Sequence, residues 1–116
     1  MGKFFLSFRT SLIEQLQTTK DFKEGFVDGI KITELIWPED RVVNLSKMVF
    51  VNCTLGSVNA ARIDLTNSII SNCDFLHFKG LTLENIKSTW NYKHNRMAGI
   101  KLPSEIQKVL DAEKKE

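Results

Sequence analysis

Apolar residues recur along this chain with a spacing of five. Counted in steps of five, the positions from Leu45 to Phe75 include no polar residue. A second series lies two places earlier in each step and is small or apolar throughout: Val43, Met48, Cys53, Val58, Ile63, Ser68, Cys73, Phe78 and Leu83. A step of five spirals around an α-helix, and in a straight strand it sends successive side chains to opposite faces. The pattern therefore predicts a chain that turns a corner after each pair.

Regular corners would close the chain into a coil of about twenty residues, with four sides of about five residues each. FVNCTL at 50–55 and ISNCDF at 70–75 repeat an Asn-Cys pair after twenty residues, as this closure predicts. Residues twenty apart would then stack about 4.8 Å from one another, as neighbouring strands do. At one corner Ala60 and Gly80 would stack inward, beside Val58 and Phe78. The first coil is expected to be irregular, because Pro38 and Asp40 fall in the two series.

The segment from Val43 to about Trp90 resembles the pentapeptide-repeat family, most clearly over residues 43–78. Units of that family read roughly small-(Asp/Asn)-(Leu/Phe)-x-x, and seven successive units stand in this register: VNLSK, MVFVN, CTLGS, VNAAR, IDLTN, SIISN and CDFLH. The Asp/Asn position holds Asn44, Asn59, Asp64 and Asp74, whereas Val49, Thr54 and Ile69 depart from it. The resemblance implies an all-β solenoid, a short right-handed quadrilateral β-helix of about three coils with flanking N- and C-terminal α-helices.

A chain of 116 residues is expected to form a single domain, because a second domain would leave neither half a proper core. Residues 1–20 are predicted to be an N-terminal capping helix, since Phe5, Phe8 and Leu16 follow helical spacing. Residues 26–90 would be the repeat and 91–103 an irregular exit segment. A C-terminal helix is predicted over 104–116, beginning at a capping-box pattern.

Both helices are expected to cover the open ends of the solenoid. Two other uses remain open at this point: homodimerisation through the C-terminal helix and membrane-surface attachment by the Phe-rich N-terminal stretch, although no membrane is favoured. The resemblance supports the first of these, because gyrase-protecting members of the family dimerise by that end.

The composition, 42% hydrophobic and 26% charged, is typical of a globular protein, and the net charge of +2 does not by itself indicate nucleic-acid binding. No apolar run approaches the ~20 residues that span a bilayer, and the first residues do not fit a signal peptide. A cytoplasmic location is therefore predicted.

The candidate reactive groups do not form a catalytic or metal-binding pattern. Cys53 and Cys73, with His77 and His94, lack the close pairs of a zinc site. Both cysteines are expected to stack inside the coil as thiols, although stacked Cα atoms at ~4.8 Å would also permit a disulfide. Asp64 and Glu84 would stack on a flat solvated side, which supplies no cleft. The protein is predicted not to be an enzyme and to bind no cofactor or metal.

The segment TWNYKHNRMAGIKLP at 89–103 carries the chemistry of a binding surface. It mixes aromatic and cationic residues, and the predicted partner-binding set is Trp90, Tyr92, Lys93, His94, Arg96 and Arg62. The alternative is that Trp90 closes the column above Ile70 and the rest carries the chain to the last helix.

The leading functional hypothesis is a non-enzymatic protein–protein interaction module or scaffold whose partner is an unidentified protein. The first alternative, implied by the resemblance, is a DNA-mimicking gyrase-binding protein of the quinolone-protection type. Against it, residues 41–90 carry five basic and three acidic side chains, where a DNA mimic needs a strongly acidic rod. The second alternative is nucleic-acid binding through the exit segment, although no nucleic acid is favoured.

Overall fold

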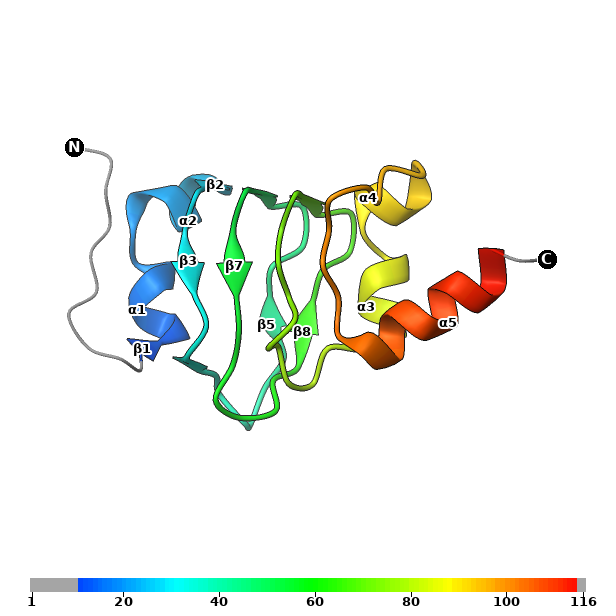
Figure 1. Cartoon of the computed structure of the whole chain (residues 1–116). Helices are drawn as coiled ribbons and strands as arrows, with labels where there is room; N and C mark the ends of the chain where they lie inside the picture. Colours follow the sequence, from blue (N-terminus) through cyan, green and yellow to red (C-terminus); the bar gives the residue numbers. More distant parts are fainter. Residues whose placement is uncertain (1–10, 115–116) are drawn as a thin grey trace.

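A computed structural model describes residues 11–114, in which a central run of short strands is flanked by helices on both sides (Figure 1). The strands are two or three residues long: β1 (Ser11–Leu12), β2 (Phe26–Asp28), β3 (Lys31–Ile32), β4 (Leu35–Ile36), β5 (Val43–Asn44), β6 (Val49–Val51), β7 (Thr54–Leu55), β8 (Ile63–Asp64) and β9 (Ile69–Ser71). The helices are α1 (Ile13–Gln17), α2 (Lys20–Glu24), α3 (Leu83–Lys87), α4 (Trp90–Lys93) and α5 (Ser104–Lys114).

All strand pairs are parallel, and the paired segments lie about twenty residues apart in the chain. The sheets are β2–β6–β9, β1–β4, β3–β7 and β5–β8. Val43 pairs with Ile63 and Val49 with Ile69, so the twenty-residue pairing predicted from the sequence is present here. We call one such passage of the chain, from a strand to its neighbour in the sheet, a lap.

The first lap, from β2 to β6, is longer than the later ones. An irregular first coil was expected because Pro38 and Asp40 fall in the two series. Phe26 pairs with Val49, which is a separation of 23 residues. The Val58 amide donates to the Leu35 carbonyl, again 23 residues away, whereas Val43 pairs with Ile63 only 20 residues away. The three additional residues therefore lie between Leu35 and Val43, in the segment that contains Pro38.

The inward positions of the laps form one hydrophobic core. Its inward members from the two predicted series are Val43, Leu45, Phe50, Cys53, Leu55, Ile63, Leu65, Ile70, Cys73, Phe75 and Phe78, all buried. Ser68 is buried among them and its hydroxyl donates to the Leu65 carbonyl at 2.8 Å. Each buried leucine, isoleucine or phenylalanine contributes roughly 1.5–3 kcal/mol, so this core is the main source of stability.

The predicted inward stack of Ala60 and Gly80 is wrong. Ala60 and Gly80 are exposed, Val58 is 44% exposed, and Ala61 is buried instead. The Ala61 amide donates to the Lys79 carbonyl, and a Cβ on Gly80 would collide with the Ala61 backbone. The inward position at this corner therefore falls one residue later than predicted, at Ala61 instead of Ala60, and the predicted positions resume at Ile63.

One corner of the laps is made by residues with positive φ. Gly29, Asn52, Asn72 and Gly99 have φ of 84°, 58°, 55° and 84°. They occupy matching positions, because Lys31 pairs with Thr54, Thr54 with Asp74 and Asp74 with Lys101. Glycine and asparagine tolerate this conformation best. The side-chain amide of Asn72 donates to Asn52 Oδ1 at 2.7 Å, so the two repeated asparagines are neighbours at this corner.

The N-terminal end is closed by two helices rather than the predicted single helix 1–20. Ser11–Leu12 is a strand that pairs with β4, and residues 1–10, with Phe5 and Phe8, lie outside the described residues. The Thr19 hydroxyl donates to the Leu16 carbonyl, and Thr19 is extended, with φ −74° and ψ 157°. Threonine therefore separates α1 from α2.

At the C-terminal end, α3 and α4 replace the end of the predicted repeat 26–90 and the start of the predicted irregular segment 91–103. Thr82 and Asn85 form a capping box at the start of α3. The Thr89 hydroxyl accepts the Tyr92 amide and begins α4. The last helix is α5, close to the predicted position, and none of the helices in residues 11–114 is long and apolar enough to cross a bilayer.

Candidate interaction site at the C-terminal end

The exposed edge of β9 is covered by a side chain instead of another strand. Asn91 is buried, and its Oδ1 accepts the Ile70 amide at 2.6 Å. Its Nδ2 donates to Ser71 Oγ at 3.2 Å and to the Arg96 carbonyl at 3.1 Å. The amide of Asn91 therefore supplies the acceptor that a neighbouring strand would supply, and its donor joins β9 to the loop after α4. It fixes α4 and the following loop to the sheet.

Two other edges at this end are covered in a related way. Asn85 Nδ2 donates to the Ile63 carbonyl of β8 at 2.9 Å. The Lys101 amide donates to the Cys73 carbonyl and the Phe75 amide donates to the Lys101 carbonyl. Segment 99–102 thus forms a further bridge after Asp74. The Ile63 and Cys73 carbonyls and the Phe75 amide at this end are therefore paired.

Five of the six predicted partner-binding residues lie together on α4 and the loop after it. The half-buried Trp90 ring stacks on His94, with centroids 4.5 Å apart and an interplanar angle of 20°. Lys93 Nζ donates to Asn67 Oδ1 at 2.7 Å, and Arg96 is exposed. Tyr92 is half-buried, with Lys87 Nζ 5.8 Å from its ring centroid. We call these five residues the α4 cluster: Trp90, Tyr92, Lys93, His94 and Arg96.

Trp90 does not lie above Ile70, as the alternative interpretation of the sequence expected; the neighbouring Asn91 occupies that position. Asn91 is the residue whose side chain meets the Ile70 amide. The Trp90 amide donates to the Ser68 carbonyl at 2.8 Å, so Trp90 follows Ile69 at the edge of the sheet.

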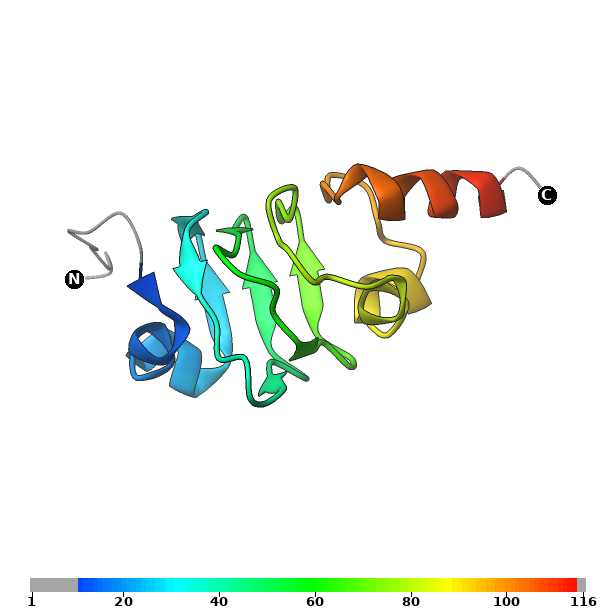
Figure 2. The same cartoon turned by 90° about the horizontal axis from the view of Figure 1, so that it is seen from below.

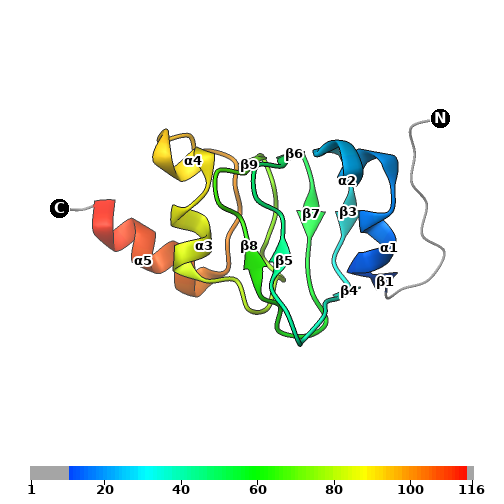
Figure 3. The same ribbon diagram turned by 180° about the vertical axis from the view of Figure 1, so that it is seen from behind.

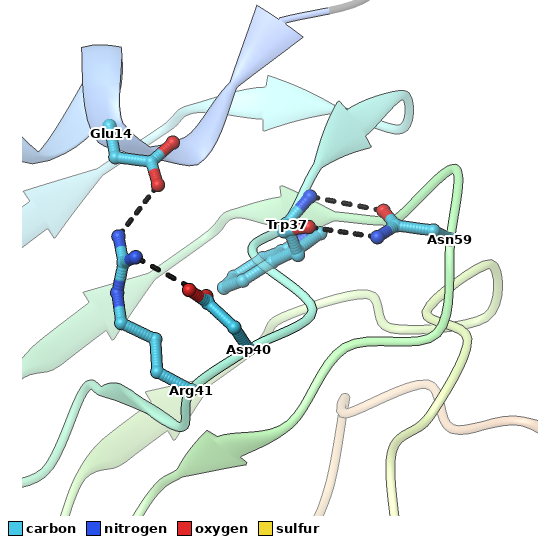
Figure 4. Close-up of polar contacts among 5 residues, drawn as sticks. All are labelled: Glu14, Trp37, Asp40, Arg41 and Asn59. Carbon is cyan, nitrogen blue, oxygen red and sulfur yellow. Dashed lines mark hydrogen bonds and ion pairs between the residues drawn. The ribbon is translucent and has the colours of Figure 1, made fainter.

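Arg62, the sixth predicted residue, is not part of the α4 cluster. Its guanidinium donates to the Glu39 carbonyl at 2.9 Å, in the longer corner of the first lap. Figure 4 shows the packing of this corner, where Asn59 Oδ1 accepts the Trp37 amide at 3.0 Å and Asn59 Nδ2 donates to the Trp37 carbonyl at 2.8 Å. Arg41 forms an ion pair with Glu14 at 2.6 Å. These contacts hold the corner in place. Arg62 belongs to this corner, where its role is structural.

A groove of about 670 Å³ lies between α4, the following loop and α5. Its lining is Tyr92, Asn95, Met97, Ala98, Ile100, Gln107, Leu110 and Glu113. Glu113 forms an ion pair with Lys87 at 2.9 Å, and this pair raises the pKa of Lys87. The sequence analysis missed the groove, because its shape depends on the direction of α5, which runs outward from the body (Figure 2).

The two cysteines are buried thiols, as predicted. Cys53 Sγ donates to the Val27 carbonyl and Cys73 Sγ to the Phe50 carbonyl, so the two lie in successive laps. The hydrogen bond with Cys53 and burial both raise the pKa of Cys73. Within residues 11–114 no three potential metal ligands of the His, Cys, Asp and Glu types gather at one place.

The carboxylate pair considered from the sequence does not form a stacked ladder. Asp64 Oδ1 accepts both the amide and the hydroxyl of Thr66, at 2.9 and 2.6 Å, and these bonds lower the pKa of Asp64. Glu84 lies on α3, and the residue of α3 that bonds to β8 is Asn85.

Comparison of the chain with protein-family models, with curated proteins and with solved structures gave no match.

Proposed function

We propose that this protein is a non-enzymatic interaction module that binds another protein through the α4 cluster. The observation that carries this proposal is the grouping of Trp90, Lys93, His94 and Arg96 on α4 and the loop after it, which the buried Asn91 ties to the sheet. Tryptophan and arginine are enriched among the residues that dominate binding energy at interfaces. A site held in place before binding loses less conformational entropy when the partner arrives.

The fold within this proposal is a short right-handed quadrilateral β-helix of the pentapeptide-repeat type. The twenty-residue register, the two buried series and the column of positive-φ corners support it. Nuclear Overhauser contacts between the backbones of Val43 and Ile63, and of Val49 and Ile69, would test the stacking in solution. Antiparallel contacts in their place would contradict it.

The proposed location is the cytoplasm. The two buried thiols support it, because reduced cysteines are typical of that compartment. Fractionation of the source cells with an antibody against the protein would test this part of the proposal.

Capture of partners with matched baits tests the proposed function. The wild-type chain and a Lys93→Ala/His94→Ala/Arg96→Ala variant would be used to capture proteins from lysate of the source cells. The control bait is Lys79→Ala, which removes an exposed cation outside the α4 cluster. A protein captured by wild type and control, but lost with the triple variant, is the expected result. Equal capture by all three baits would overturn the assignment of the site.

A nucleic acid is the second candidate partner, because Lys93, His94 and Arg96 are exposed. His94 stacks on the Trp90 ring, and such mixtures of basic and aromatic side chains bind single strands. Affinity for a single-stranded oligonucleotide would then fall steeply with salt, by a logarithmic slope of about −0.7 for each phosphate contacted. A flat salt dependence would exclude this candidate. The gyrase-binding alternative is not proposed, because residues 42–102 carry seven basic and three acidic side chains.

Homodimerisation through α5 is a further candidate within the same class. α5 projects from the body, and Val109 on it is 43% exposed. Light scattering of the wild type and a Val109→Lys variant would test it, and the same monomeric mass for both would remove this candidate.

A further inference from the structure

A column of apolar residues lies on the outward face of the three-stranded sheet. Phe26, Val49 and Ile69 are in register on β2, β6 and β9 and point away from the core, since the residue after each is buried. Phe26 is 52% exposed. A side chain of this size on the solvent face of a strand is unusual, because solvent faces of half-buried strands are ordinarily polar.

Trp90 continues the same column. The Val49 amide donates to the Gly25 carbonyl, and the Ile69 amide donates to the Met48 carbonyl. The Trp90 amide donates to the Ser68 carbonyl in the same pattern, so Trp90 follows Ile69 as Ile69 follows Val49. Figure 3 shows β6, β9 and α4 following one another along one edge of the molecule. We call this surface the apolar column: Phe26, Val49, Ile69 and Trp90.

The two ends of the apolar column carry opposite charge. Asp28 is exposed on β2, two residues after Phe26 and on the same face. Lys93 follows Trp90 on α4, and Arg96 lies in the next loop. Within residues 11–102 the charges follow the same direction. Residues 11–41 carry seven acidic and four basic side chains, a net charge of −3, whereas residues 42–102 carry three acidic and seven basic, a net charge of +4.

We propose that the occupant of this face is a second copy of the chain, packed face to face across a two-fold axis with the two long axes antiparallel. This inference rests on the proposed function, because it names a partner for the α4 cluster. The antiparallel arrangement sets Phe26 of each copy against Trp90 of the other, and Asp28 of each copy beside Lys93 of the other. A parallel arrangement would bring like charges together at both ends, which opposes association.

The face is large enough for a specific dimer. The molecule is 46 Å long and 21 to 26 Å across. A specific interface buries about 800 Å² on each partner, so the apolar column would form its centre and the rest of that side of the molecule would supply the remaining area. The aromatic residues at both ends of the column provide the anchors, and each is used twice in a two-fold dimer.

Sedimentation equilibrium from about 1 µM to about 1 mM protein at low salt tests the dimer. The wild type should dimerise, and Phe26→Lys should raise the dissociation constant by about 100-fold, because both copies lose an anchor. The matched controls are Val42→Lys and Val58→Lys, which place the same charge at apolar residues of similar exposure, 53% and 44%, outside the column. Both controls should dimerise like the wild type.

A charge exchange tests the antiparallel orientation without altering the apolar residues. Lys93→Glu should weaken the dimer by about tenfold, and adding Asp28→Lys should restore it, because the pair changes sign on both copies together. Failure of the second substitution to restore the dimer would overturn the orientation. This pair also keeps the proposal testable if Phe26→Lys is found unfolded by circular dichroism.

Two results would overturn the dimer itself. One is a monomer at every concentration, and the other is a dimer that Val109→Lys weakens and Phe26→Lys does not, which would assign the contact to α5. If the chain is a monomer but its bait still loses a captured protein with the Lys93→Ala/His94→Ala/Arg96→Ala variant, the dimer is excluded and the proposed function stands. If the dimer forms and that capture fails, the dimer stands and the protein's partner is its own copy.

Discussion

Replacing Asn91 with alanine removes the side chain that covers the edge of β9. The Ile70 amide then has no acceptor, and Ile70 is completely buried. An unpaired buried amide costs about 1–3 kcal/mol. The donor bonds to Ser71 Oγ and to the Arg96 carbonyl are lost as well, each with a net value of about 1 kcal/mol, although both groups lie close enough to the surface to be hydrated. We expect a loss of about 3 kcal/mol in the free energy of unfolding.

Urea denaturation at equilibrium measures this loss, and thermal unfolding should show a fall of about 10 °C in Tm for a chain of this length. Asn44→Ala is the matched control. Asn44 Oδ1 also accepts a backbone amide, that of Ser46, but the contact is exposed. The control should cost less than about 1 kcal/mol. A loss with Asn91→Ala no larger than with the control would refute the inference that this amide replaces a strand.

A second substitution separates the hydrogen bonds of Asn91 from its volume. Asn91→Leu retains a side chain of similar size but supplies neither donor nor acceptor. We expect it to destabilise the protein at least as much as alanine does, because the Ile70 amide remains unpaired and an apolar group now faces Ser71 Oγ. Recovery of stability with leucine would mean that packing, not hydrogen bonding, is the role of Asn91.

Four further predictions follow from the corners and the turns. Lys47 has φ of 61°, so Lys47→Asn should stabilise the fold by about 0.5–1 kcal/mol in urea denaturation, and a destabilisation would contradict this. Gly80→Ala should destabilise by at least about 2 kcal/mol, because Gly80 has φ of 89° and a Cβ would collide with the Ala61 backbone; a neutral effect would show that this corner can relax. Asn59→Ala should cost about 2–3 kcal/mol, because the buried Trp37 loses an acceptor for its amide and a donor for its carbonyl, and an unchanged urea midpoint would argue against this pairing. The hydrogen bonds of Thr66 lower the pKa of Asp64 in the folded state, so their contribution is present above the unfolded pKa of about 3.9 and is lost as the pH falls through the lower folded value; thermal melts from about pH 6 to about pH 2 should lose this contribution in the wild type and not in Asp64→Asn.

The twenty-residue pairing was predictable because it rests on two local rules. Burial requires small or apolar residues at fixed intervals, and a corner with positive φ favours glycine or asparagine. Cys53 and Cys73 satisfy the first rule, and Asn52 and Asn72 the second. Both rules are visible in a single sequence, because each concerns residues that occupy equivalent places in successive laps.

The inward position of Ala61 and the helices α3 and α4 were not predicted, for different reasons. Nothing in the residues around Ala60 distinguishes the two registers, since both alanines fit an inward position. For the helices the signals were present, because Thr82 and Thr89 both begin capping patterns. The period of five continues through Leu83 and Trp90 and favoured the wrong interpretation there. The capping residues determine the structure of this segment, because no later strand follows in residues 11–114 that could pair with a further lap.

The candidate site was predicted in part. The α4 cluster is contiguous in sequence, and four of its members stand on one short helix or at its end. Arg62 could not be assigned correctly, because its contact with the Glu39 carbonyl joins residues 23 apart through the longer first lap. The groove and the apolar column depend on how distant segments are placed, and Phe26 joins that column only because its lap is three residues longer than the next.

Asparagine side chains lie where the regular pairing of the laps is widened or ends. A primary amide has a carbonyl acceptor and an N–H donor in nearly the geometry of a peptide group. Asn59 uses both on the backbone of Trp37 beside the longer corner, and Asn91 uses both at the edge of β9. Asn85 Nδ2 donates to the Ile63 carbonyl of β8, the last strand of the β5–β8 sheet. A sheet that ends or widens leaves buried peptide groups unpaired, and an amide on a short side chain can pair them without adding a strand. The repeat is therefore able to end after few laps, and α4 and its exposed residues are held in place by the same bonds that end it.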